Sequence, residues 1–264
     1  MYKRQDEASL CREFGLDPEK QLHLYISSFG YASMSEEEVA ELSKMAGTDF
    51  TGFAKTNRIS MQETLRWFDE YLGQHPEVEL VYRRHPSEWN SPALESLAKK
   101  RPNFHVIFAD SVKQWIVAAD SISIWMSTAI AEVYMAGKSC HILRPVPIEH
   151  EYDPVIYKDA RYVTSYDAFA AAMAEPEPPF PIAREVIEGY FDPSDTPAYK
   201  RMADLLEDVY KNPPRDEPMG AGFTPHFNKL KLCALAGVHF LYKHGWEPKK
   251  VFACLLYTSP SPRD

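Results

Sequence analysis

Short apolar runs alternate with amphipathic stretches from Asp6 to Ala174, and this alternation constrains the fold more than any other feature of the sequence. Strands that are separated by helical stretches indicate βαβ units, and βαβ units build a parallel sheet. We therefore predict an α/β fold, with a Rossmann-like parallel sheet flanked by helices. The expected strands are Leu22–Ser27, Glu79–Arg83, His105–Phe108, Ser121–Ile124, Cys140–Leu143 and Tyr162–Thr164.

Residues with a helical period fill the gaps between these strands. Ser60, Ser111 and Ser165 stand where helices should begin, because a serine hydroxyl can accept a hydrogen bond from a free N–H of the first turn. Gly73 and Gly137 are expected stops, because glycine adopts the left-handed backbone at least cost. The expected helices are Ser60–Leu72, Pro92–Lys99, Ser111–Ala118, Thr128–Ala136 and Ser165–Met173.

The chain divides into four parts by composition. Residues 1–5 and 254–264 resemble translated sequencing-adapter read-through at the ends of a metagenomic contig, and we expect neither to belong to the fold. A natural disordered tail is the alternative. Residues 6–175 form the predicted Rossmann-like domain, and residues 176–253 begin with a proline-rich connector that is followed by helices. Those helices are expected at Ile182–Tyr190, Tyr199–Lys211 and Lys229–Tyr242.

Charge and composition exclude several classes of protein. The formal net charge of -9 gives no positive field that would attract nucleic acid. The four cysteines lack CxxC spacing, and a chain of this size needs no disulfides to fold. The sequence shows neither a signal peptide nor an apolar run long enough to span a membrane. We expect a cytoplasmic protein that could act at the inner face of the membrane.

A first candidate site lies where the strand Glu79–Arg83 ends. His85 follows this strand, and the carboxyl ends of parallel strands face the crevice where α/β sheets bind ligands. Arg84 is the adjacent cation, although Arg83 and Arg84 alternate faces and only one can share a face with His85. A histidine in an ordinary surface loop is the alternative interpretation.

A second candidate site follows the strand Ser121–Ile124. Ser127 and Thr128 stand between this strand and a predicted helix, a position where hydroxyls and backbone N–H groups can meet a phosphate. Glu132 comes one helical turn after Thr128, so its carboxylate can accept hydrogen bonds from sugar hydroxyls on the same face. The alternative is that the hydroxyls only cap the helix and that Glu132 is solvated.

Two further strand ends carry weaker signals. Ser27 and Ser28, at the end of the first strand, are small hydroxyl residues that let a backbone approach a phosphate. Arg144, after Cys140–Leu143, is a cation at the same edge of the sheet. An ordinary βα turn and a surface salt bridge are the respective alternatives.

These pieces together resemble a known family. Several segments are similar in order and spacing to the C-terminal domain of bacterial surface-carbohydrate enzymes with the GT-B fold: Arg84-His85-Pro86, Phe108 to Val112, Ala119-Asp120, Ser127-Thr128, Glu132 and Ala136-Gly137-Lys138. Those enzymes include capsule-type Kdo transferases, polysialyltransferases and teichoic-acid glycerophosphotransferases. The similarity covers about residues 10–175.

The resemblance implies roles for these residues and an incomplete enzyme. His85, Ser127 and Thr128 would contact the donor phosphates, and Glu132 the ribose or sugar hydroxyls. The loop around Ala109 to Val112, which includes Ser111, would contact the base. The resemblance also implies one half of a GT-B fold, with the acceptor domain and its general base outside this chain. No cofactor or metal is expected.

The resemblance implies a glycosyltransferase that transfers a sugar from a CMP-, CDP- or UDP-linked donor to a glycan or lipid-linked acceptor of a surface polysaccharide. In that function His85 and Glu132 are the catalytic candidates. The substrate-binding candidates are Ser27, Ser28, Arg84, Ser111, Ser127, Thr128 and Arg144. Two alternatives stay open: a non-hydrolysing nucleotide-sugar epimerase, and a non-catalytic nucleotide-binding subunit of a polysaccharide assembly complex.

Overall fold

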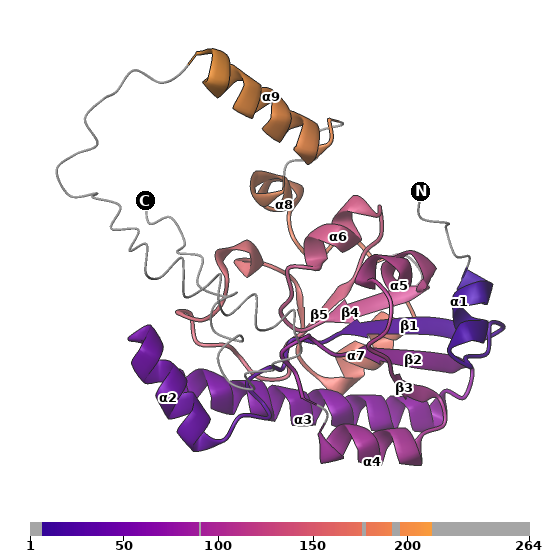
Figure 1. The fold of residues 1–264 in the computed structure, drawn as a ribbon. Coiled ribbons are helices and arrows are strands. Elements are labelled where there is room, and N and C mark those ends of the chain that lie inside the picture. The colour runs from indigo at the N-terminus through magenta and orange to yellow at the C-terminus, as the bar shows by residue number, and fades with distance from the viewer. Residues whose placement is uncertain (1–6, 90, 176–177, 192–195, 213–264) are drawn as a thin grey trace, which may run out of the picture. The chain divides into compact units, whose positions relative to one another are not determined.

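Six parallel strands form one sheet in the computed structural model, which describes residues 7–89, 91–175, 178–191 and 196–212. The strand order is β3-β2-β1-β4-β5-β6 (Figure 1). This topology confirms the predicted α/β fold with a Rossmann-like parallel sheet. The strands are β1 (Gln21–Ile26), β2 (Val78–Arg83), β3 (Phe104–Val106), β4 (Ser121–Ile124), β5 (His141–Leu143) and β6 (Tyr162–Val163).

Helices cover both faces of the sheet, and each face has its own apolar core (Figure 1). Side chains alternate along each strand, so in β1 Leu24 joins one core and Tyr25 the other. One face is covered by α1 (Glu7–Glu13), α5 (Val112–Ala118), α6 (Ile130–Met135) and α8 (Arg184–Tyr190). The other is covered by α3 (Thr51–Gln74), α4 (Pro92–Lys100) and α7 (Tyr166–Met173). Two further elements are α2 (Glu36–Ala46) and the 3-10 turn η1 (Val155–Tyr157).

Several predicted caps are confirmed. The Ser111 hydroxyl accepts a hydrogen bond from the Lys113 N–H at 3.3 Å, and Ser165 caps α7 in the same way. Gly137, after α6, has a φ of 68°, in the left-handed region. Serine and glycine therefore mark these boundaries for the local reasons that the sequence indicates.

Two predicted boundary signals on α3 are wrong. The helix begins at Thr51, so Ser60 lies inside it with a fully buried side chain and caps nothing. Gly73 also lies inside α3 and does not end it. A Cβ at Gly73 would stand 2.5 Å from Nη2 of the Arg101 side chain, which would then have to shift.

The described chain forms two units, divided between Pro193 and Ser194. In the first unit, Ile182 and Ile187 are buried in the core beneath α8. In the second, α9 (Ala198–Lys211) carries an exposed apolar stripe that includes Met202 and Leu206. The predicted helix Lys229–Tyr242 and the adapter-like ends at 1–5 and 254–264 lie outside the described residues. No helix in the described ranges has the length and apolarity to cross a membrane.

Candidate functional site

The winding of the chain reverses at the carboxyl ends of β1 and β4, the position where open α/β sheets have their binding crevice. From β1 the chain winds outward through β2 and β3, then returns to β4 on the other side of β1. Ile26 at the end of β1 is in register with Arg83 of β2 and with Ile124 of β4. Ligands of open α/β sheets bind at this reversal of winding. The segments that follow β1, β2 and β4 carry Ser27 and Ser28, Arg84 and His85, and Ser127 and Thr128.

A buried carboxyl group links the end of β1 to the turn after β2. Glu88 accepts hydrogen bonds from Ser27 Oγ at 2.5 Å and from Tyr82 Oη at 2.7 Å. Only 4% of Glu88 is exposed, and burial raises the pKa of its carboxyl group. Ser27 is itself 1% exposed, so its hydroxyl serves this internal network.

His85 stands in the turn that Glu88 supports. Its Nδ1 accepts a hydrogen bond from the Ser87 N–H at 3.2 Å and lies 2.7 Å from Ser87 Oγ. Because Nδ1 is an acceptor, the hydrogen of the neutral ring is on Nε2. Partial burial lowers the pKa of the imidazole. The turn packs tightly on the loop after β1, since a Cβ at Gly30 would lie 2.6 Å from Ser87 Oγ.

The two arginines at the end of β2 fix neighbouring loops. Arg83 donates to the carbonyls of Ala109, at 2.6 Å, and Asp110, which has a left-handed φ of 66°. Arg84 Nη1 donates to the carbonyl of Glu88 at 3.2 Å, and its guanidinium lies 5.6 Å from the centre of the Phe108 ring. Both side chains are therefore held against the loops that border the crevice. The predicted contact of Arg84 with the nucleotide substrate stays a prediction.

The turn between β4 and α6 is joined to the β1 loop. Ser28 Oγ accepts a hydrogen bond from the Met126 N–H at 3.2 Å. Ser127 Oγ accepts from the Ala129 N–H at 3.3 Å, so this hydroxyl orders the turn. Thr128, by contrast, has an exposed side chain. The predicted helix Thr128–Ala136 is shorter than expected: α6 begins at Ile130, and Thr128 lies in the turn before it.

Glu132 lies on α6 and reaches towards α5, the helix that Ser111 caps. Glu132 Oε1 is 3.9 Å from Lys113 Nζ, and its side chain is 35% exposed. Since Lys113 is 72% exposed, this weak pair leaves the carboxylate within reach of a ligand. The Ser111 hydroxyl is used as the cap of α5, so its predicted part in binding stays a prediction.

Arg144 is a buried cation at the end of β5. Its residue exposure is 4%, and Nη2 donates to Asp153 Oδ1 at 2.8 Å. The guanidinium lies between 5.2 and 5.4 Å from the ring centres of Tyr162, Tyr157 and Trp125. Within the described chain Nε and Nη1 have no hydrogen-bond partner. The alternative, a surface salt bridge, is half right. Arg144 does pair with Asp153, but its side chain is buried among three aromatic rings.

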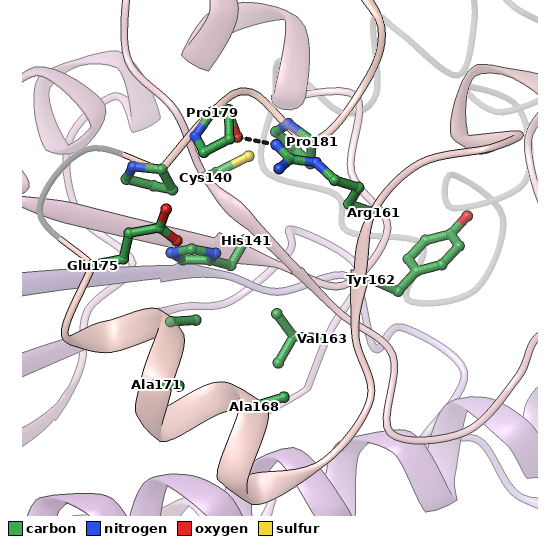
Figure 2. A pocket seen from close by; sticks show the side chains of 12 residues that line it. Cys140, His141, Arg161, Tyr162, Val163, Ala168, Ala171, Glu175, Pro179 and Pro181 are labelled. Carbon is green, nitrogen blue, oxygen red and sulfur yellow. Dashed lines mark hydrogen bonds between the residues drawn. The ribbon is translucent and has the colours of Figure 1, made fainter.

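The cavity of about 440 Å³ shown in Figure 2 lies elsewhere. It is lined by His141 at the start of β5, Arg161 and Tyr162 at the start of β6, and Glu175 beyond α7. These residues are at the amino ends of the strands, opposite the carboxyl ends that carry His85 and Thr128. None of the predicted site residues lines this cavity.

Sequence reasoning missed the residues that hold the site together. Glu88 follows His85 by three positions, a spacing that could have suggested a contact across one turn. Tyr157 and Asp153 carry no such signal, because they act on residues that are 30 and 9 positions away. Among the residues that the structure describes, no group of three or more metal-ligating side chains occurs.

No protein-family model and no curated protein matches the chain. Solved structures with a similar fold include a UDP-N-acetylglucosamine 2-epimerase, 14% identical over 79% of this chain and 47% of that chain, with a TM-score of 0.43. The wall teichoic acid polymerase TagF is 10% identical over 78% of this chain and 47% of that chain, with a TM-score of 0.43. The S. aureus MnaA–UDP co-structure is 13% identical over 80% of this chain and 48% of that chain, with a TM-score of 0.40. The chain spans about half the length of each protein, and the likeness is one of fold.

Proposed function

We propose that this chain is the nucleotide-binding half of a glycosyltransferase that transfers a sugar from a nucleotide-activated donor to a surface polysaccharide. The observation that carries the proposal is that hydrogen bonds connect the segments after β1, β2 and β4, where the winding of the chain reverses. Ser27 of the β1 loop donates to Glu88 of the turn after β2. Ser28 of the same loop accepts from Met126 after β4. One fixed crevice edge thus carries the imidazole of His85 and the hydroxyl of Thr128.

Charge develops on the leaving nucleotide as the bond to the sugar breaks, and fixed donors at that place lower the barrier. His85 suits this task because Ser87 occupies Nδ1 and so places the hydrogen on Nε2. Thr128 adds a neutral hydroxyl from an exposed position in the next loop. In this proposal Glu132 accepts hydrogen bonds from ribose or sugar hydroxyls. The donor phosphates are then met by side-chain donors, without a bound metal ion.

Nucleotide binding is the first test. Thermal unfolding is measured with CMP, CDP, UMP and UDP; a ligand at 100 times its dissociation constant stabilises by about 2.7 kcal/mol. We expect His85→Ala to weaken diphosphate binding by about tenfold or more, since a hydrogen bond to a charged group contributes about 1.5–3 kcal/mol. His75→Ala is the matched control, because His75 precedes β2 and its ring bonds to Glu77. If none of the four nucleotides binds, the proposal fails.

The reaction is tested in a full-length parent enzyme that includes an acceptor domain. With a radiolabelled nucleotide sugar and a glycan acceptor, a transferase produces labelled glycan. An epimerase changes the sugar without any acceptor. We expect His85→Ala to abolish transfer and to keep the fold. Wild-type turnover in that variant would refute the role of His85.

A further inference from the structure

Tyr157 makes two hydrogen bonds to a single residue of the β4–α6 turn. Its hydroxyl accepts from the Ser127 N–H at 2.8 Å and donates to the Ser127 carbonyl at 2.7 Å. The two residues are 30 positions apart. Tyr157 thereby satisfies both backbone groups of the residue that directly precedes Thr128.

The tyrosine is itself rigidly held. Only 1% of Tyr157 is exposed. Tyr162 Oη donates to the Tyr157 carbonyl at 2.6 Å, and the Arg144 guanidinium lies 5.3 Å from the centre of the Tyr157 ring. Asp153 in turn fixes Arg144 at 2.8 Å. A buried cation, Arg144, and a second tyrosine, Tyr162, therefore hold Tyr157 in place.

Hydrogen bonds within the protein fix the backbone on both sides of Thr128. The Ser127 N–H is taken by Tyr157, the Ala129 N–H by Ser127 Oγ, and the Ile130 N–H by the Ser127 carbonyl. Thr128, which has an exposed side chain, stands between these internally bonded residues. Because the backbone on both sides of Thr128 is fixed in this way, the turn does not have to be ordered anew at each binding event.

We propose that Tyr157 is a positioning residue of the donor site, and that its hydroxyl fixes Ser127 so that Thr128 is held ready for the donor phosphates. This inference rests on the proposed function. Burial raises the pKa of Tyr157. The phenol therefore stays protonated and can donate and accept at the same time. The arrangement serves the phosphate end of a nucleotide.

The test compares ligands with and without phosphates. Calorimetric titration at 25 °C measures the affinity of wild type and Tyr157→Phe for UDP and CDP, and for uridine and cytidine. In Tyr157→Phe we expect the dissociation constant to rise about tenfold for whichever diphosphate binds wild type more tightly. The constant for the corresponding nucleoside should stay unchanged. The matched control is Tyr134→Phe, which removes from α6 a hydroxyl that donates to Glu188 of α8 at 2.6 Å. It should leave both constants as they are.

A merely structural tyrosine would lower the unfolding temperature and leave the ratio of the two constants unchanged, which would overturn the proposal. If Tyr157→Phe does not fold, Tyr162→Phe replaces it, because that change loosens the Tyr157 backbone and keeps the Tyr157 hydroxyl. A smaller rise in the diphosphate constant supports the inference, and an unchanged ratio overturns it. Failure of the wild type to bind any nucleotide would instead refute the proposed function, and the role of Tyr157 with it.

Discussion

At the scale of single residues, Glu88 places a buried carboxyl group at the crevice edge. Its carboxyl group is buried and is shared by Ser27, Tyr82 and the backbone of the His85 turn. Burial raises its pKa although these hydrogen bonds act in the opposite direction. The folded protein thus binds a proton at Glu88 more tightly than the unfolded chain does.

The dependence of stability on pH follows from this direction. A carboxyl group whose pKa is raised on folding contributes most stability below its unfolded pKa, and loses that contribution as pH rises through the folded value. We therefore expect the free energy of unfolding of wild type, relative to Glu88→Gln, to increase as pH falls from 7 to 4.5. Each pKa unit corresponds to about 1.4 kcal/mol. Urea unfolding of both proteins at several pH values measures this difference.

Glu63→Gln is a suitable control for the Glu88 experiment, because Glu63 is 41% exposed on α3 and pairs with Arg66 at the surface. It should follow wild type across the same pH range. A difference between wild type and Glu88→Gln that stays flat or shrinks in acid would contradict the environment assigned to Glu88.

At the scale of elements, His23 ties β1 to β4 inside the sheet. Its Nδ1 lies 2.7 Å from Ser121 Oγ and its Nε2 2.8 Å from Ser123 Oγ. The imidazole is fully buried, and desolvation, assisted by His141, lowers its pKa from 6.5 to about 3. His23 is thus a core residue.

A base whose pKa is lowered on folding contributes stability above its unfolded pKa and loses it as pH falls towards the folded value. At about 1.4 kcal/mol for each pKa unit, His23 accounts for a loss on the order of 5 kcal/mol between pH 7 and pH 3. We expect His23→Gln to be less stable at pH 7 but to lose stability less steeply in acid. His150→Gln, which changes an exposed histidine, should keep the wild-type slope. Parallel curves for His23→Gln and wild type would contradict this.

The elements also show what a sequence can and cannot predict. The strands were predictable to within about two residues, because a buried parallel strand must be apolar on both faces. The start of α3 was not, because Ser60 has the local chemistry of a cap and only tertiary packing buries it. At the site, the strand ends that carry His85 and Thr128 follow from the alternation of elements. Their supports Glu88, Tyr157 and Asp153 do not, since each acts through a contact that exists only after folding.

At the scale of the whole molecule, the core extends past the predicted boundary at residue 175. Ile187 is fully buried and Ile182 is 4% exposed, and both pack in the core of the α8 face. The backbone N–H of Arg161, just before β6, also donates to the Pro181 carbonyl at 2.9 Å. Residues beyond 175 therefore complete the first unit, which ends at Pro193.

Truncation tests this extent of the core. Burial of one isoleucine side chain stabilises by about 1.5–3 kcal/mol, so a chain that ends at Glu175 should lose at least about 3–6 kcal/mol with Ile182 and Ile187. A domain is stable by only about 5–15 kcal/mol, so this chain should unfold at a much lower urea concentration. A chain that ends at Pro193 keeps both isoleucines and should retain the transition of the full chain. Equal midpoints for the two truncated chains would show instead that residues 6–175 fold without α8, and that the isoleucines contribute little.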